Sequence, residues 1–221
     1  IINGTPPYAQ GNFSGVWTLE QLAKNYYFYG DGIANSLRFR ASAVAYLSRT
    51  PGSTSSQTTA TWSTWVKRGN FGRSQMLFSN RQSFSSSNYL TDIRFTSSDQ
   101  ISFGLYDSSS SNFYSLVTTP VYRDPSAWYH VVIVLNTTNA TAANRLLMYV
   151  NGVQVTAFST ASYPPQNFVS GVNTSGYPSW IGNWPASSPN SSENLDGYMA
   201  DIYFIDGQAL DPSYFGVTAT A

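Results

Sequence analysis

Hydrophobic and polar residues alternate with a period of two along most of the chain after residue 35. Ala60, Trp62 and Val66 share one face of a segment, and apolar side chains recur at every second position over residues 101–105. Successive side chains of a β-strand point to opposite faces, so this period predicts strands with one buried face. Ser, Asn, Asp and Gly bound these segments and favour turns between them.

The second half of the chain indicates how such strands pair. Residues 128–135 are apolar on both faces, which is typical of a central strand covered on two sides. The Asn151-Gly152 pair favours a two-residue hairpin, because both turn positions accept a positive φ. About a dozen strands with almost no helix predict an all-β fold, an antiparallel two-sheet β-sandwich or jelly roll.

The first residues lack the period of two. Residues 1–34 are expected to form an N-terminal arm or linker with a short helix, and residues 35–221 the β domain. The helix is predicted over residues 17–28, where Thr18 and Gln21 form a capping-box pattern. Since the first residue is not Met, we expect a processed chain or a segment of a longer one.

Charge and composition exclude several classes of partner. The formal net charge is zero and 10% of residues are charged, so no long-range field attracts nucleic acid or an anionic membrane. No apolar run approaches the length of a membrane span. We therefore expect no nucleic-acid partner and no membrane insertion. The polar residues are mostly Ser, Thr and Asn, which is typical of exposed adhesive β proteins.

A series of motifs stands in a fixed order in the second half. It runs W-Y-H-V at 128–131, L-x-x-Y-V-N-G at 146–152, I-G at 181–182, D-G at 196–197 and A-L at 209–210. This order resembles the laminin-G-like branch of the concanavalin A-like jelly rolls over residues 35–216. Members of that fold mostly bind glycans or proteins at loops and at the concave sheet. Some use a calcium ion, and a minority are glycan hydrolases.

The segment 14–39 resembles the approach to such domains in bacteriophage virion proteins. Together the resemblances imply a non-enzymatic, extracellular module on the virion surface. As part of a phage fibre or appendage, this module would bind a host cell-surface glycan. Other virion proteins are expected partners. Because phage fibres are usually trimeric, a homo-oligomer, preferably a trimer, is expected. The alternatives are a structural protein that decorates a capsid or stabilises a fibre, and a glycan hydrolase.

Hydrolysis of a glycosidic bond needs two carboxylates that face each other across it. The hydrolases of the resembling fold place theirs at alternate positions of one strand. This chain has two glutamates, Glu20 and Glu193, both outside predicted strands, and no acidic residues two positions apart. We therefore predict no enzyme activity, although a pair of aspartates distant in sequence is left open.

The loop 183–196 is the best candidate for a sugar site. It combines an aromatic platform with amide and carboxylate groups that bond sugar hydroxyls. The candidate carbohydrate-binding residues are Tyr177, Asn183, Trp184, Asn190, Glu193 and Asn194. The alternative is that Trp184 packs in the core, as we expect for Trp180.

Two single residues have competing interpretations. His130, the only histidine, is predicted to be a strand residue, because zinc ligands and a Gly-x-Ser-x-Gly motif for a Ser-His-Asp triad are missing. Asp201 alternates with Tyr203 on an apolar face, where it would be a structural carboxylate paired with an arginine (Arg38, Arg40 or Arg94) or one ligand of a calcium ion. No further calcium ligand matches the resembling fold, so no cofactor is expected and calcium is left open.

The alternation also predicts which residues form the core. The predicted core residues are Trp62, Phe103, Ile133, Met148, Ile202 and Phe204.

Overall fold

The computed structural model describes residues 35–81, 90–107, 112–183 and 193–215, and the backbone of two short strands near the N-terminus. These are β1 (Ile2–Asn3) and β2 (Val16–Trp17), which pair antiparallel. Internal contacts separate Ile1–Ser36 from Leu37–Ala221, so each unit is described by itself. All but the first residue of the predicted helix at 17–28 lies outside the described residues. The boundary at residue 34 stays a prediction.

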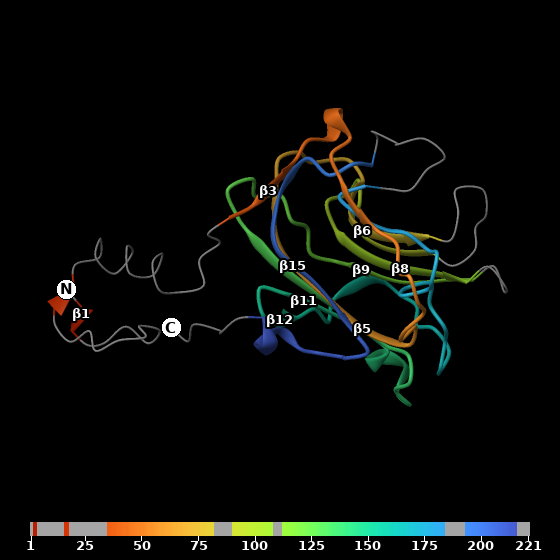
Figure 1. Cartoon of the computed structure of the whole chain (residues 1–221). Helices are drawn as coiled ribbons and strands as arrows, with labels where there is room; N and C mark the ends of the chain where they lie inside the picture. The colour runs from red at the N-terminus through yellow and green to blue at the C-terminus, as the bar shows by residue number, and fades with distance from the viewer. Residues whose placement is uncertain are drawn as a thin grey trace. The chain divides into compact units, whose positions relative to one another are not determined.

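The β domain consists of two antiparallel sheets stacked face to face (Figure 1). The six-stranded sheet has the order β12 (Val153–Gln154), β11 (Leu146–Val150), β10 (Tyr129–Asn136), β5 (Thr59–Arg68), β15 (Gly197–Asp206), β3 (Leu37–Phe39). The seven-stranded sheet has the order β13 (Phe158–Ala161), β9 (Asn112–Thr118), β8 (Ile101–Asp107), β7 (Leu90–Phe95), β6 (Gln75–Arg81), β14 (Ser179–Ile181), β4 (Leu47–Arg49).

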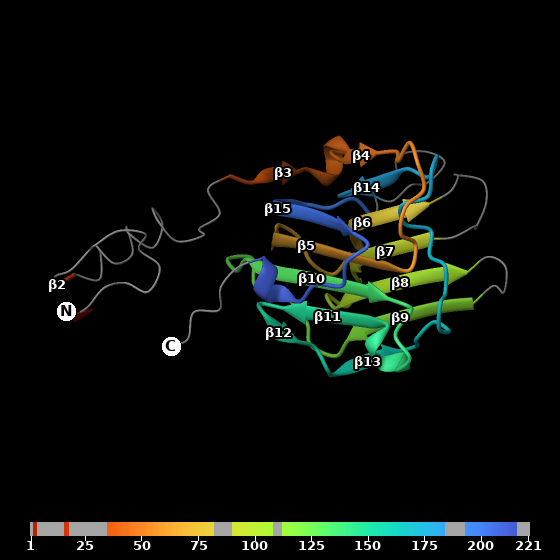
Figure 2. The same cartoon turned by 60° about the horizontal axis from the view of Figure 1, so that its bottom comes forward.

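Figure 2 shows the six-stranded sheet in front of the seven-stranded one, which confirms the predicted two-sheet sandwich. The described residues include two short 3-10 helices between strands, η1 (Ala41–Ala43) and η2 (Ala142–Asn144), and a third after the last strand, η3 (Pro212–Tyr214). Within the described ranges no helix has the length and apolar character that crossing a membrane requires.

The core lies between the two sheets and follows the predicted period. Trp62 on β5 faces Ile133 on β10, which in turn faces Met148 on β11. These three and Phe103 on β8 are buried, as predicted. The other two predicted core residues, Ile202 and Phe204, pack against this core but are only partly buried.

A hairpin and a bulge set the geometry at two other points. Asn151 and Gly152 have φ values of 52° and 78°, which confirms the predicted tight turn between β11 and β12. The side chain of Asn151 also fixes the neighbouring strand, because its Oδ1 accepts a hydrogen bond from the main-chain N–H of His130 at 2.8 Å.

Asp201 does not lie on a buried apolar face, so that prediction is wrong. The register between β15 and β5 shifts between Ala200 and Tyr203, and Asp201 takes a left-handed φ of 48°. A bulge of this kind inserts an extra residue and ends the alternation of faces. Asp201 is therefore exposed, as is Tyr203, and the expected arginine partners lie elsewhere: Arg38 pairs with Asp196, for example.

Candidate functional site

The outer face of the seven-stranded sheet, the side turned away from the six-stranded sheet, carries an unusual set of residues. On β8 the side chains of Ile101, Phe103 and Leu105 belong to the core, so the alternate residues Gly104 and Tyr106 lie on the outer face. The strand register therefore assigns the outer-face residues of the neighbouring strands as well.

One residue from each of six adjacent strands falls in line across this face. We call this set the central row: Ser48, Trp180, Ser79, Asp92, Gly104 and Ser115. Four of its members are serine or glycine, so only Trp180 and Asp92 project larger side chains from it. Trp180 is buried, as expected, but on the outer face rather than between the sheets.

Asp92 is a buried carboxylate with unused hydrogen-bonding capacity. The residue is 1% exposed, and neither side-chain oxygen has a hydrogen-bond partner among the described residues. Its one ion pair joins Oδ2 to Arg94 Nε at 3.2 Å. Burial raises the pKa of Asp92 to about 6, against the opposing charge of Arg94 and with a further increase from Glu193. Buried polar groups are normally hydrogen-bonded, so such a carboxylate calls for a functional explanation.

An aromatic pair lies next to Asp92. Tyr106 on β8 faces Phe113 on β9 across the strands, and Phe113 is 43% exposed. A Cβ atom at Gly104 would lie 2.5 Å from Phe113 Cζ and 2.6 Å from Asp92 Oδ1. Only glycine at position 104 therefore lets the phenyl ring and the carboxylate meet above β8.

The predicted sugar-binding loop is attached to the same face. The main-chain oxygen of Asn183 accepts a hydrogen bond from Ser79 Oγ at 2.8 Å, and that of Glu193 accepts one from the N–H of Met76 at 2.8 Å. Both ends of the loop therefore join β6 beside the central row. This also explains why the charge of Glu193 reaches Asp92.

The predicted sugar-binding residues that the structure describes differ from one another in burial. The side chains of Asn183 and Asn194 are buried, and each has an Oδ1 atom without a hydrogen-bond partner. Tyr177 and Glu193 are half-buried. Trp184 and Asn190 lie outside the described residues. The role of all six predicted residues in sugar binding stays a prediction.

His130 lies in β10, which confirms the prediction of a strand histidine. Its Nε2 is 2.9 Å from Ser63 Oγ, and its ring stacks on Trp65 with centroids 4.9 Å apart. Burial lowers the pKa of His130, although the charge of Asp201 opposes this. Ser63 and His130 are both buried, so we assign the pair to packing and not to nucleophilic catalysis.

The structure also tests a calcium site. Among the described residues no three His, Cys, Asp or Glu side chains cluster in a way that could hold a metal ion. The residues present there do not fit calcium, and whether the protein needs a metal stays a prediction.

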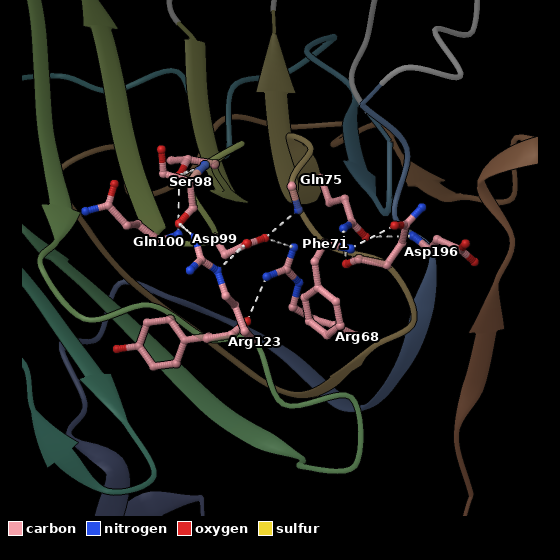
Figure 3. Close-up of polar contacts among 12 residues, drawn as sticks. Arg68, Phe71, Gln75, Ser98, Asp99, Gln100, Arg123 and Asp196 are labelled. Atoms are coloured by element: carbon pink, nitrogen blue, oxygen red, sulfur yellow. Dashed lines mark hydrogen bonds and ion pairs between the residues drawn. The ribbon is translucent and has the colours of Figure 1, made fainter.

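A buried charge cluster, which sequence patterns did not indicate, joins the two sheets at one end of the domain (Figure 3). Asp99, in the turn between β7 and β8, pairs with Arg68 Nη2 at 2.9 Å and with Arg123 Nε at 2.7 Å. Arg68 ends β5 of the opposite sheet and also donates to the main-chain oxygen of Tyr122 at 2.8 Å. Since Arg68 is fully buried and both carboxylate oxygens of Asp99 are engaged, this cluster stabilises the fold and does not bind a ligand.

Comparisons with known proteins agree with this architecture. A family model described as the concanavalin A-like lectin/glucanases superfamily matches residues 41–213. No curated protein sequence matches the chain.

Several solved structures share the fold. The carbohydrate-binding module of the Ruminococcus gnavus IT-sialidase, bound to α2,6-sialyllactose, has a TM-score of 0.55 at 12% identity, covering 83% of this chain and 97% of that one. Domain 4 of the Geobacillus stearothermophilus arabinanase AbnA, in complex with arabinotriose, has a TM-score of 0.54 at 18% identity, covering 76% and 69%. Domains LG4-5 of the mouse laminin alpha1 chain have a TM-score of 0.55 at 13% identity, covering 94% and 48%.

Proposed function

The chain belongs to the concanavalin A-like lectin/glucanases superfamily, and from this premise we propose that it is a non-enzymatic glycan-binding module. The proposed site is the outer face of the seven-stranded sheet around Asp92, Tyr106 and Phe113. One observation carries the proposal: an exposed aromatic ring lies directly beside a buried carboxylate that has no hydrogen-bond partner.

This combination suits a sugar. The apolar face of a pyranose stacks on an aromatic ring, while its hydroxyl groups need planar acceptors close by. The oxygens of Asp92 are such acceptors, and Oδ1 lies beside the Phe113 ring above Gly104. In this proposal the exposed ring of Phe113 moves aside and a sugar hydroxyl group reaches the carboxylate. The loop 183–196 also contributes to binding in this proposal, through Trp184, Asn190 and Glu193.

Two variants distinguish the sheet face from the loop. We expect Phe113→Ala to weaken glycan binding about fivefold, because one stacking contact contributes on the order of 1 kcal/mol. Trp184→Ala should abolish binding if the loop supplies the main platform. Tyr214→Ala is the matched control, since this exposed tyrosine lies in η3, outside the seven-stranded sheet. Isothermal titration calorimetry against glycans selected on an array measures the effect.

Each result of that titration leads to a different conclusion about the site. Equal binding by Phe113→Ala and the wild-type protein would remove the sheet face from the site. Loss of cooperative unfolding in Trp184→Ala would show that this tryptophan packs in the core. Loss of binding in both folded variants would indicate one site made of sheet and loop.

The biological setting is part of the proposal. The resemblance of residues 14–39 to bacteriophage virion proteins supports a host-glycan receptor-binding role on the virion surface, as part of a fibre or appendage. A single weak site gains avidity by multivalent display, which supports a homotrimer. A structural protein that decorates a capsid or stabilises a fibre is the alternative, and a glycan array separates the two. Light scattering that shows a monomer for the native polypeptide would remove the trimer.

One observation favours a hydrolase as a second candidate. Asp92 and Glu193 are near enough for the charge of Glu193 to raise the pKa of Asp92, and glycosidases use two carboxylates. We expect no reducing ends to be released from host polysaccharide, because the chain has no two acidic residues at alternate positions of one strand. Release that Glu193→Gln abolishes would establish the enzyme instead.

A further inference from the structure

A cavity of about 170 Å³ opens at the edge of the sandwich, where β4 and β14 face β15 of the other sheet. Its apolar lining consists of Leu47, Pro51, Phe78, Ile181 and Phe204. The rings of Phe78 and Phe204 are stacked with centroids 5.6 Å apart, and each comes from a different sheet. This cavity is called the edge pocket below.

Hydrogen bonds hold one wall of the edge pocket in place. Gly176 donates to the main-chain oxygen of Pro51 at 3.1 Å, and Ser55 donates to that of Asn173 at 3.1 Å. Asn173 Nδ2 donates to Asp206 Oδ1 and to the main-chain oxygen of Ser56, both at 2.9 Å. The loops that carry Pro51 and Asn173 are therefore pinned to each other and to the end of β15. A pocket with such a wall is largely formed before a ligand arrives, as is usual for small-molecule sites.

The size of the edge pocket sets the size of its ligand. An apolar cavity of roughly 150 Å³ holds one benzene ring. The edge pocket is slightly larger and mostly apolar, so it accommodates a single six-membered ring with a small substituent. A whole oligosaccharide does not fit in a cavity of this volume.

The charge at the edge pocket sets the chemistry of the substituent. Arg49 is the one charged residue among those that line it, and within the described part of the chain it has no ion pair. Ser179 also lines the pocket, and its Oγ accepts a hydrogen bond from Asn80 Nδ2 at 3.0 Å, which leaves its O–H available to donate. Both groups are donors, so they favour an acceptor with negative charge.

We propose that the edge pocket binds a small aromatic carboxylate, with the ring against Phe78 and Phe204 and the carboxylate at Arg49. This site is distinct from the glycan site, because β14 alternates: Trp180 belongs to the outer face, whereas Ser179 and Ile181 line the edge pocket. The proposal therefore does not rest on the proposed glycan-binding function.

Benzoate and benzyl alcohol are the probes, since they share the ring and differ in charge. Titrated into the full chain and followed by backbone amide shifts, benzoate should bind with a dissociation constant on the order of millimolar. The shifts should concentrate at Leu47–Arg49 and Ser179–Ile181. Benzyl alcohol should bind about three- to fivefold more weakly, the effect of one partly exposed ion pair. Arg49→Gln should remove this difference, and Arg40→Gln, an exposed arginine outside the pocket, should keep it.

Ser179→Leu places apolar side-chain atoms inside the edge pocket and should abolish binding of both probes. Retained binding in a folded Ser179→Leu variant would overturn the proposal, as would benzoate shifts that avoid both strands. Equal affinity of the wild-type protein for the two probes would overturn the role of Arg49. If Ser179→Leu does not fold, the shift map of the wild-type protein still decides the location.

Discussion

Asp99→Ala should lower the free energy of unfolding by about 3–5 kcal/mol, because it leaves the buried guanidinium of Arg68 without its counter-charge. Urea denaturation at pH 7 measures this, with Asp124→Ala as the control. Asp124 is exposed and bonds only locally to Ser126, so its removal should shift the urea midpoint far less. Equal effects of the two substitutions would contradict the assignment.

A double variant separates an unpaired charge from lost packing. Arg68→Met combined with Asp99→Ala should be more stable than Asp99→Ala alone, since no buried charge then remains unpaired. Arg123 is 60% exposed in its side chain and can return to water. If the double variant is the less stable one, Arg68 contributes mainly through its contacts with the rings of Phe71 and Phe95.

Acid should weaken the same cluster. Burial alone would raise the pKa of Asp99, but hydrogen bonds from Arg123, Gly72 and Arg68 outweigh burial and lower the pKa below its usual value of 3.8. The folded state then binds the proton less tightly than the unfolded chain. The contribution of Asp99 to stability is therefore present above pH 3.8 and is lost as the pH falls below it.

Asp92→Asn should have the opposite effect and raise the free energy of unfolding by up to about 3 kcal/mol at pH 8. The pKa of Asp92 is about 6 in the folded protein, whereas the ordinary pKa of an aspartate is 3.8. Each pKa unit between the two states corresponds to about 1.4 kcal/mol in the free energy of unfolding. The folded state binds this proton more tightly, so ionisation destabilises the fold increasingly as the pH rises from 3.8 to about 6. The gain from the substitution should vanish near pH 4.

The same variant tests function. The substitution exchanges one acceptor oxygen for an amide donor, so Asp92→Asn should bind glycan more weakly while it unfolds at higher urea concentration. Asp124→Asn is the matched control, because Asp124 is exposed, lies outside the loop 183–196 and bonds locally to Ser126, so its substitution should change stability and glycan binding far less. Higher stability with unchanged binding would show that Asp92 does not contact the ligand.

The sequence predicted the sandwich because the period of two survives in strands such as β5 and β8, and the Asn151-Gly152 turn because its conformation is local. The bulge at Asp201 could not be predicted, because a register shift depends on how β15 pairs with β5. The hydrophobic pattern of β15 alone does not contain that pairing. The same limit applies to Asp92. The alternation with Ile93 gives its face, but its neighbours Gly104 and Phe113 become visible only when the register of three strands is known.

The contact above Gly104 makes the residues at positions 104 and 113 interdependent in evolution. A Cβ atom at position 104 would press on the ring of Phe113 and on Oδ1 of Asp92, so a smaller residue at 113 relieves one of the two contacts. Substitutions at the two positions should therefore show epistasis, with Gly104→Ala tolerated better after Phe113→Ala than before it, and best when Asp92 also changes. A lineage that acquires a side chain at position 104 should therefore change residue 113 first, because glycine has a hydrogen atom where every other residue has a Cβ atom.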